Sequence, residues 1–363
     1  MFTMSEHDIS TIRRATVDDL EAIVHLIRMG DERDYGPENV AQYIQRLNPA
    51  YTQAWMAVVG RRPVGMTMTF QRMLRAPKRQ YMARYWANLF IDPDYRHLML
   101  YPRLLKLKFG ESKQDGIDFL YAMVRRPRLI EAHVRIGFTK IADVMVMVKP
   151  LRPGRLVTKY KTLPRFLAMF TWPVDWLFSR YLRMRQPHRP SGLTINEVSW
   201  NSAEVADFAE LLKDSCADRI GQVWTSDAIR RRFTYSLDGE PYVLLVSRRE
   251  GQVVAAIVYR TVNRDRGIRM GVVMDLVFRD KEELAAQAVL AEAQRRSYAE
   301  GADGMMCLNG SGPGMQKLLV ADGYFVSSER YSLLLWPKAK LSADPVLCDI
   351  SCWRLAFSDH DAF

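Results

Sequence analysis

Apolar positions in the first 150 residues follow two periods, one typical of strands and one typical of helices. Residues 10–15 have a strand pattern, and Thr16 followed by acidic residues suits the start of a helix. A second helix is expected near Pro37. The pattern then predicts strands at 54–59, 64–74, 81–92 and 117–124, helices at 102–114 and 128–136, and a closing strand or hairpin after Gly137.

The second half of the chain repeats this order. Helices are expected at 202–215, 225–233, 282–301 and 315–324, and strands or hairpins at 193–200, 242–260, 268–278, 303–308 and 325–336. Local sequences also correspond, since GIDFLYAMV resembles GADGMMCLN and AHVRIGF resembles LLVADGY. We interpret the repeat as two copies of one α/β (α+β) domain. A chance resemblance between two unrelated α/β domains is the alternative.

The repeat predicts a division of the chain into two domains, a linker and a tail. The first domain covers 1–150, a basic aromatic linker 151–190, the second domain 191–340 and a C-terminal tail 341–363. A chain of 363 residues is long enough for two cores, and 48% hydrophobic with 26% charged residues is a globular composition. We see no secretory signal or membrane-spanning run, so a cytoplasmic location is expected.

The four cysteines argue against a metal site. Cys348 and Cys352 are spaced C-x3-C without a nearby histidine or cysteine partner, and the other two are scattered, so we expect no bound metal.

The net charge of +11 favours an anionic partner, and its distribution matters more than its size. Between Leu151 and Pro190 there are nine basic residues and a single acid, Asp175. Because the excess lies in a connecting segment, the sequence disfavours a nucleic-acid enzyme. The same segment is rich in aromatic residues, which leaves two interpretations open. The aromatics pack between the domains, or the segment lies peripherally on an anionic membrane, at the inner face.

The element order, present twice, resembles that of the GNAT superfamily of N-acyltransferases. The segment NLFIDPDYRHLMLYPRLLKLKFGESKQDGIDFLYAM is similar to the superfamily's central block, and IEAHVRIGF is similar to its Y-x-x-x-G-F turn. His133 occupies the aromatic position of that turn. In the loop R/Q-x-x-G-x-G/A, Arg96 fits the first position, whereas Met99 and Tyr101 stand where small residues are usual. The resemblance implies two GNAT-like domains, each a mixed sheet flanked by helices.

The resemblance implies acetyl-CoA or another acyl-CoA as co-substrate. A loop entering a helix offers N–H donors and a positive dipole end to the pyrophosphate, and Pro102 suits the first turn of that helix. The residues expected to bind CoA are those of the central strand, the loop and one strand exit: Leu89, Phe90, Ile91, Arg96, His97, Leu98, Met99, Leu100, Tyr101 and Arg126. Arg125 and Arg128 flank the last of these.

The resemblance also suggests catalytic residues. The strand carboxylate that often acts as base is replaced by Asn88, which can orient a water, so Glu131 or Asp92 is left as the candidate base. His133 replaces the usual tyrosine acid, and a histidine titrates near neutral pH. A partly buried structural role for His133 is the alternative, and Tyr121 is a further candidate acid. In the second copy, Asp280, Glu282 and Glu283 would repel a pyrophosphate.

These features together predict an acyl-CoA-dependent N-acyltransferase, an N-acetyltransferase in its simplest form, acting on the amino group of a small molecule or amino sugar. Two alternatives remain. One is a non-catalytic protein that keeps the fold as a binding or scaffold module. The other is a membrane-surface acyltransferase with a lipid-linked acceptor.

Overall fold

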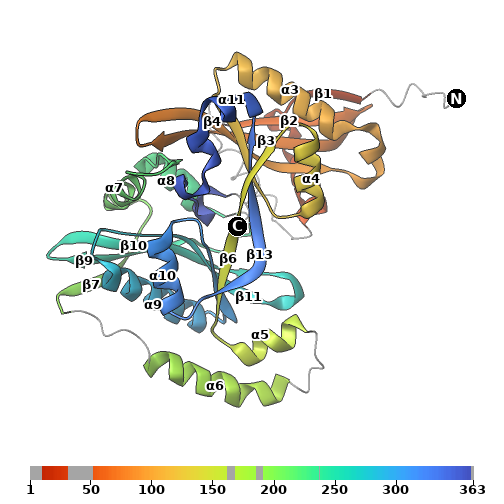
Figure 1. Cartoon of the computed structure of the whole chain (residues 1–363). Helices are drawn as coiled ribbons and strands as arrows, with labels where there is room; N and C mark the ends of the chain where they lie inside the picture. Colours follow the sequence, from red (N-terminus) through yellow and green to blue (C-terminus); the bar gives the residue numbers. More distant parts are fainter. Residues whose placement is uncertain (1–9, 32–51, 162–167, 185–190, 237, 361–363) are drawn as a thin grey trace. The chain divides into compact units, whose positions relative to one another are not determined.

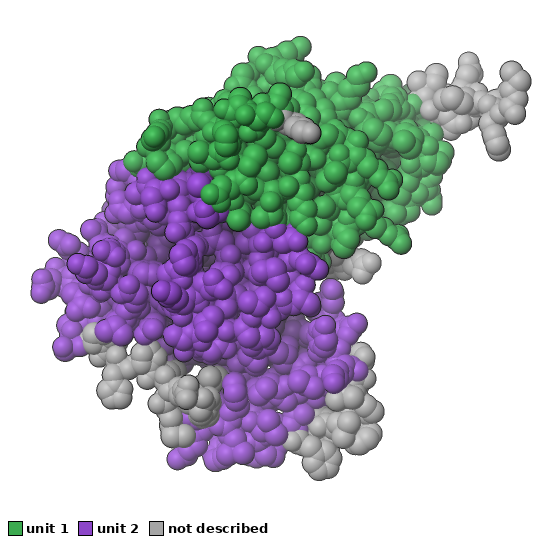
Figure 2. Space-filling model, viewed as in Figure 1, with its two compact units in different colours: residues 1–142, 235–239, 332–350 green, residues 143–234, 240–331, 351–363 purple. Residues whose placement is uncertain are grey.

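The computed structural model describes residues 10–31, 52–161, 168–184, 191–236 and 238–360. The chain forms two compact units, each built from separate stretches of sequence (Figure 2). Unit 1 contains residues 1–142, 235–239 and 332–350, and unit 2 contains residues 143–234, 240–331 and 351–363. The helix expected near Pro37 lies outside the described residues.

Unit 1 is built on a sheet in the order β1-β2-β3-β4-β5-β13 (Figure 1). The first four strands are antiparallel neighbours, β5 runs parallel to β4, and residues 332–336 of β13 pair antiparallel with β5. The bounds are β1 (Ser10–Arg14), β2 (Thr52–Val59), β3 (Arg62–Ala76), β4 (Arg79–Ile91), β5 (Phe119–Val124) and β13 (Phe325–Trp336).

The helices of unit 1 cover the apolar side chains of this sheet. They are α1 (Leu20–Asp31), preceded by the 3-10 turn η2 (Val17–Asp19), then η3 (Pro93–Leu98), α3 (Leu100–Gln114), α4 (Pro127–Arg135), α11 (Lys338–Ala343) and η6 (Pro345–Cys348). One buried cluster joins Trp86, Leu105, Leu120 and Phe138 with Leu334 from β13. A second joins Trp55 and Val64 to Leu100 and Leu104 of α3.

The sheet of unit 2 has the order β6-β12-β11-β10-β9-β7. Its central strand β11 is parallel to β12 and antiparallel to β10. The bounds are β6 (Thr139–Pro150), β7 (Leu193–Val198), β9 (Val243–Arg249), β10 (Gln252–Asn263), β11 (Arg269–Phe278) and β12 (Gly304–Leu308). The two-residue strand β8 (Gly221–Gln222) lies outside this order. A single strand, β6, follows Gly137, where the sequence left a strand or a hairpin open.

The last strand of each half of the sequence, β6 or β13, pairs in the unit formed mainly by the other half. Residues 143–150 of β6 belong to unit 2, where β6 pairs antiparallel with β12 from Leu308 to Gly304. Residues 332–336 of β13 belong to unit 1, where they pair with residues 120–124 of β5. Each unit therefore takes its last strand from the other half of the sequence, so the units do not coincide with contiguous ranges such as 1–150 and 191–340.

The helices of unit 2 pack on its sheet through small and apolar residues. They are α5 (Pro153–Tyr160), α6 (Ala168–Met184), α7 (Val205–Ser215), α8 (Ser226–Phe233), α9 (Glu283–Ala299) and α10 (Pro313–Ala321), with short turns η5 (Asp265–Gly267), η7 (Ile350–Cys352) and η8 (Phe357–Asp359). Four alanines of α9 are buried against the strands, at 285, 286, 288 and 293. Gly271 of β11 allows close packing, because a Cβ there would lie 2.8 Å from the Ser297 Oγ.

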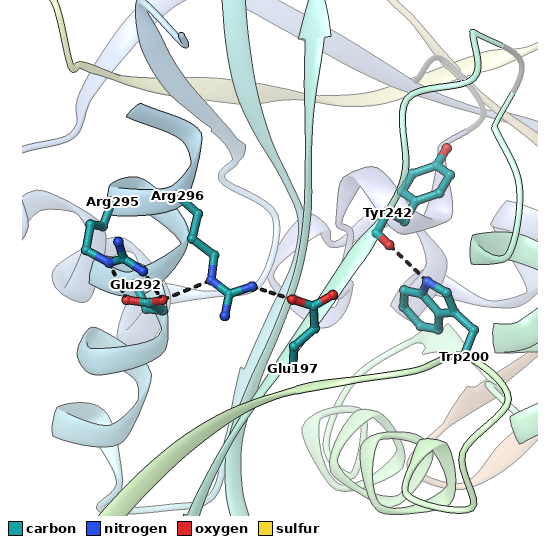
Figure 3. A network of polar contacts seen from close by, with 6 residues as sticks. All are labelled: Glu197, Trp200, Tyr242, Glu292, Arg295 and Arg296. Atoms are coloured by element: carbon teal, nitrogen blue, oxygen red, sulfur yellow. Dashed lines mark hydrogen bonds and ion pairs between the residues drawn. The ribbon is translucent and has the colours of Figure 1, made fainter. Parts of the chain in front are cut away.

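A polar network fixes α9 beside β7 (Figure 3). Glu292 accepts hydrogen bonds from Arg295 at 2.7 Å and 2.8 Å and from Arg296 at 2.9 Å, which lowers the pKa of its carboxyl to about 2. Arg296 also pairs with Glu197 of β7. In the same view Trp200 donates to the Tyr242 carbonyl at 2.9 Å. The contacts of Arg296 with Glu292 and Glu197 hold α9 against β7, the edge strand of unit 2.

Candidate functional site

The sheet of unit 1 has a discontinuity between its parallel strands β4 and β5. The two strands pair only through Ala83, Arg84 and Tyr85, opposite residues 119–121. Beyond this point β4 continues to Ile91 paired with β3, and β5 continues to Val124 paired with β13. Residues 86–91 and 122–124 therefore do not pair with each other, so their facing main-chain groups take no part in a β4–β5 ladder.

A bulge in β4 lies beside this discontinuity. The register with β3 jumps from Met68 opposite Ala87 to Met66 opposite Phe90, so Asn88 and Leu89 face a single residue. Asn88 has φ 51°, in the left-handed region that asparagine tolerates better than most residues. A bulge leaves main-chain groups outside the ladder and re-aims side chains, and it is common next to active sites. Asn88, Leu89, Phe90 and Ile91 are all half-buried here.

The loop after β4 is held by Asp92. Its buried carboxylate accepts hydrogen bonds from the Asp94 N–H at 3.1 Å, as the cap of η3, and from Arg62 at 3.0 Å. The loop ends at Met99, which has φ 52° and ψ 36°. This left-handed conformation is the one that glycine adopts without strain. The loop therefore keeps the backbone shape for which small residues are usual, although methionine occupies the position.

The first turn of α3 follows directly and supplies N–H donors. The first four N–H groups of a helix have no acceptor within it. In α3 these belong to Leu100, Tyr101 and Arg103, because Pro102 has none. Arg96 and His97 are exposed just before this turn, Leu98 is half-buried and Leu100 is buried. The side chain of Met99 is 65% exposed, so it points to solvent and does not fill the loop.

An aromatic cluster lies under the loop, where β4 leaves β5. The rings of Trp86 and Tyr101 stack at 6.0 Å, and His133 of α4 lies 4.8 Å from Trp86 and 5.8 Å from Tyr101. Phe138 completes the cluster at 5.6 Å from Trp86. The cluster brings His133 and Tyr101 together from two predicted segments. Trp86 was not among the predicted site residues, and only its place on the predicted central strand could have indicated it.

His133 is neutral in this environment. Its ring is 3% exposed, and burial lowers its pKa to about 4. The Nδ1 atom lies 2.7 Å from the Leu129 carbonyl, which can only accept, so Nδ1 carries the proton and Nε2 is an acceptor. In this tautomer His133 cannot donate a proton from Nε2. The proton-donor role expected from the sequence is therefore disfavoured.

Tyr101 carries a buried hydroxyl that lacks a hydrogen-bond partner among the described residues. Burial raises its pKa, so the phenol keeps its proton at neutral pH. A buried hydroxyl without a partner costs free energy of about 1–3 kcal/mol. The cluster thus contains one donor that an occupant could satisfy, beside one acceptor, the Nε2 of His133.

The other predicted residues lie apart from this cluster. Glu131 is exposed on α4 two residues before His133, and such residues point to different faces of a helix. The Asp92 carboxylate already caps η3 and pairs with Arg62. Tyr121 lies directly opposite Tyr85 on the face of the sheet away from Trp86, where Arg72 donates to its hydroxyl at 3.4 Å. Arg126 is exposed at the start of α4, as are Arg125 and Arg128.

In unit 2, residues 351–360 fill the space at the end of the parallel β11–β12 ladder. Strand β11 pairs with β12 only from Met270 to Val273. Just beyond, Asp275 forms an ion pair with Arg354, accepts a hydrogen bond from Ser358 at 2.7 Å, and is fully buried. Leu355 donates to the Gly310 carbonyl at 2.8 Å. Residues 351–360 therefore occupy the position in unit 2 that corresponds to the β4–β5 discontinuity.

Among the described residues, no group of three or more histidine, cysteine, aspartate or glutamate side chains could hold a metal ion. The helices in the same part of the chain include none long and apolar enough to cross a bilayer.

Comparison with solved structures places this geometry in a known fold. No protein-family model matches the sequence, and no curated protein does. Yeast N-myristoyltransferase with bound myristoyl-CoA, from Saccharomyces cerevisiae, is 12% identical with a TM-score of 0.64, covering 93% of this chain and 84% of that one. The fold is that of the GNAT N-acyltransferases. A GCN5-related N-acetyltransferase from Anabaena variabilis is 11% identical with a TM-score of 0.61, covering 90% of this chain and 72% of that one.

The GNAT fold confirms the predicted fold class.

Proposed function

We propose that this protein is an acyl-CoA-dependent N-acyltransferase with its site in unit 1. The observation that carries the proposal is the combination, within one loop and one strand, of the bulge at Asn88, the end of the β4–β5 ladder, and the left-handed Met99 leading into α3. Solved structures of this fold include an enzyme with bound myristoyl-CoA. The thioester of an acyl-CoA would supply the activated acyl group.

The loop and the first turn of α3 would hold the pyrophosphate. The N–H groups of Leu100, Tyr101 and Arg103 and the positive end of the helix dipole favour an anion there. Arg96 and His97 are exposed at the same end and can add donors, and Arg126 can reach a further phosphate from the start of α4. Pro102 removes one donor, so we expect weaker CoA binding than a loop with a full set would give.

The bulge would orient the acyl group. The main chain at Leu89, where the register of β4 with β3 shifts, can polarise a thioester carbonyl by hydrogen bonding. Half-buried Leu89, Phe90 and Ile91 provide apolar surface beside it. Tyr101 then supplies the donor that stabilises the departing sulfur, since its hydroxyl is buried, protonated and without a partner among the described residues. His133 would position Tyr101 through the ring contact and offer Nε2 as an acceptor.

The acceptor we propose is an amino group of a small molecule or amino sugar, with acetyl-CoA as the simplest donor. No predicted carboxylate lies beside His133 and Asn88. We therefore assign proton removal from the amine to water oriented by Asn88, whose side-chain amide can hold a water but cannot take a proton. The exposed Glu131 is the alternative base if the acceptor approaches along α4.

Unit 2 would have a supporting role. The buried Asp275–Arg354 pair and the tail fill the corresponding position. Asp280 and Glu282 place negative charge in the loop before α9, and Glu283 does so in its first turn. A pyrophosphate held there would be repelled.

A thermal-shift titration with CoA and acetyl-CoA tests the proposal. A ligand that binds the folded state raises the melting temperature once its concentration exceeds the dissociation constant. We expect a shift for the wild type and a reduced shift for Arg96→Glu, with Lys106→Glu on the exposed face of α3 as the matched control. Tyr101→Phe should keep the shift and lower turnover with an amine acceptor.

A second candidate is a binding or scaffold protein without catalysis. The observation that favours it is the packing of Tyr101 on Trp86, which fills part of the space beneath the loop. No thermal shift at millimolar acetyl-CoA, together with no CoA found by mass spectrometry on the purified protein, would favour this candidate over the enzyme.

A further inference from the structure

The helical pair α5–α6 presents apolar side chains to solvent. Trp172 is 70% exposed, Leu177 60%, Val174 51% and Trp176 48% on α6. On α5, Tyr160 is 62% and Val157 49% exposed. We call these six side chains the α5–α6 face. Single exposed apolar residues are normal, but two tryptophans with four further apolar side chains on one helical pair need an explanation.

The helical pair is fixed to the body of unit 2. Arg152 donates to the carbonyls of Ala302 and Tyr298 at 3.0 Å and 2.7 Å, and Lys159 pairs with the buried Asp303 at 2.6 Å. Gly154 permits a close approach to α6, because a Cβ there would lie 2.6 Å from the Thr171 Cβ. The two helices (Figure 1) are thus fixed to each other and to unit 2.

The exposed charged side chains that the structure describes in α5 and α6 are all basic. Asp175 is the single acid between residues 151 and 190, and it is 5% exposed. Its carboxylate accepts from the Gly154 and Arg155 N–H groups at 2.7 Å and 3.2 Å, at the start of α5. Arg155, Lys161 and Arg180 remain exposed. The buried acid stabilises the pair, and every exposed charged side chain described between residues 151 and 180 is basic.

The exposed apolar residues of α6 lie on its outward, convex surface. Thr171, Asp175, Phe178 and Ser179 point inward, and the exposed residues cover about half of the helix circumference, with Arg180 between the tryptophans and Leu177. A convex, tryptophan-rich face with arginine fits the boundary between lipid headgroups and acyl chains, where aromatic rings and basic side chains are both favourable. A second copy of this face would oppose its own positive charges.

We propose that the α5–α6 face binds the surface of an anionic lipid bilayer. Trp172, Trp176 and Leu177 enter the region between headgroups and acyl chains, and Arg155, Lys161 and Arg180 pair with anionic headgroups. The inference stands on unit 2 alone and is independent of the reaction proposed for unit 1.

Sedimentation of the full chain with vesicles tests this. We expect binding to vesicles of phosphatidylcholine mixed with phosphatidylglycerol, little binding to phosphatidylcholine alone, and a decrease with added salt. Trp172→Ala with Trp176→Ala should lower the partition coefficient at least tenfold, and so should Arg155→Glu with Arg180→Glu. Phe325→Ala, which removes another half-exposed aromatic ring of unit 2, is the matched control and should bind as the wild type.

Because the substituted side chains are exposed, the variants should keep the wild-type circular dichroism spectrum and melting temperature. If one variant fails to fold, the blue shift of tryptophan fluorescence on adding anionic vesicles to the wild type gives an independent readout, and its absence overturns the proposal. Equal binding by the tryptophan variant also overturns it. A concentration-dependent dimer that the tryptophan variant abolishes would assign the face to a second copy instead, and binding to an acidic protein without vesicle binding would assign it to a protein partner.

Discussion

Two residues of unit 1 other than glycine are described with positive φ, Asn88 and Met99, and both lie at the candidate site. One forms the bulge of β4 and the other ends the loop before α3. Strained conformations of this kind often occur at functional sites and are maintained by the surrounding structure. For Met99 the strain has little compensation from packing, since its side chain is mostly exposed.

Met99→Gly should therefore stabilise the start of α3, by about 1 kcal/mol, because glycine adopts the left-handed region without a Cβ clash. Hydrogen exchange of the α3 amides measures the change. The control is His97→Gly, an exposed residue within η3, where glycine should instead cost about 0.5–1 kcal/mol. A loss of protection in both variants would contradict the assigned backbone conformation.

The buried His133 should make unit 1 sensitive to acid. Its pKa is about 4 in the folded protein and 6.5 as the unperturbed value, so the unfolded chain binds the proton more readily. The contribution of His133 to the free energy of unfolding is fully present above pH 6.5. It is lost as the pH falls toward 4, by about 3 kcal/mol in total. The urea concentration at the midpoint of unfolding should therefore fall as the pH is lowered from 6.5 to 4 for the wild type.

His133→Gln removes the titrating group and should flatten this part of the pH profile, even if the variant is less stable at neutral pH. A decline of the same size in the variant would assign the acid sensitivity to other groups. A direct titration of the imidazole by nuclear magnetic resonance should give a midpoint near pH 4.

At the scale of elements, the two units differ in what occupies the end of the parallel ladder. In unit 1 the aromatic cluster of Trp86, Tyr101 and His133 lies there. In unit 2 residues 351–360 bring Arg354 and Ser358 onto Asp275 of β11. The same strand order thus supports an accessible loop in one unit and a closed, ion-paired core in the other.

Breaking the buried ion pair should weaken unit 2. Arg354→Met leaves Asp275 charged and buried without its partner, which costs about 3–5 kcal/mol. The double change Arg354→Met with Asp275→Leu should recover most of the loss, since an apolar pair can replace a buried ion pair. Hydrogen exchange of the β11 and β12 amides measures the stability of unit 2 in both variants. No recovery in the double variant would show that Asp275 has a role besides this pairing.

At the scale of the whole molecule, the exchange of closing strands joins the two halves of the sequence in each unit. Unit 1 receives residues 332–350, which stack Trp336 on Phe109 at 3.9 Å and bring Asp344 to the Tyr81 hydroxyl at 2.6 Å. Lys340 pairs with Asp118 at 2.8 Å. Without this segment the edge of β5 would lack its antiparallel partner.

Residues 1–150 expressed alone should not fold cooperatively, because the chain lacks the strand that covers β5. A chain of residues 1–142 joined to 332–350 through a flexible linker should fold, and circular dichroism with thermal unfolding distinguishes the two. The matched control joins 1–142 to the same segment in scrambled order. A cooperative transition of residues 1–150 alone would contradict the strand exchange.

The order of strands and helices could be predicted from the sequence because hydrophobic periodicity is local. The alternation of β4, the helical spacing of α1 and the Thr225 cap of α8 each depend on residues close in the chain. The resemblance to the GNAT fold rested on the same local features. The loop of Arg96 to Tyr101 and the position of His133 were also predicted together, since they lie in adjacent elements of one pattern.

Long-range packing decided the rest. Strand β6 pairs with β12, about 160 positions later in the chain, and β13 pairs with β5, about 210 positions earlier. These pairings place the closing strands in the opposite units, and no local hydrophobic period encodes them. Burial lowered the pKa of His133, packing turned Tyr101 inward onto Trp86, and Asp175 of α6 became the cap of α5. The sequence alone determined which elements form, because that depends on neighbours in the chain; the tertiary structure decided protonation, accessibility and partnership, because these depend on side chains that only folding brings together.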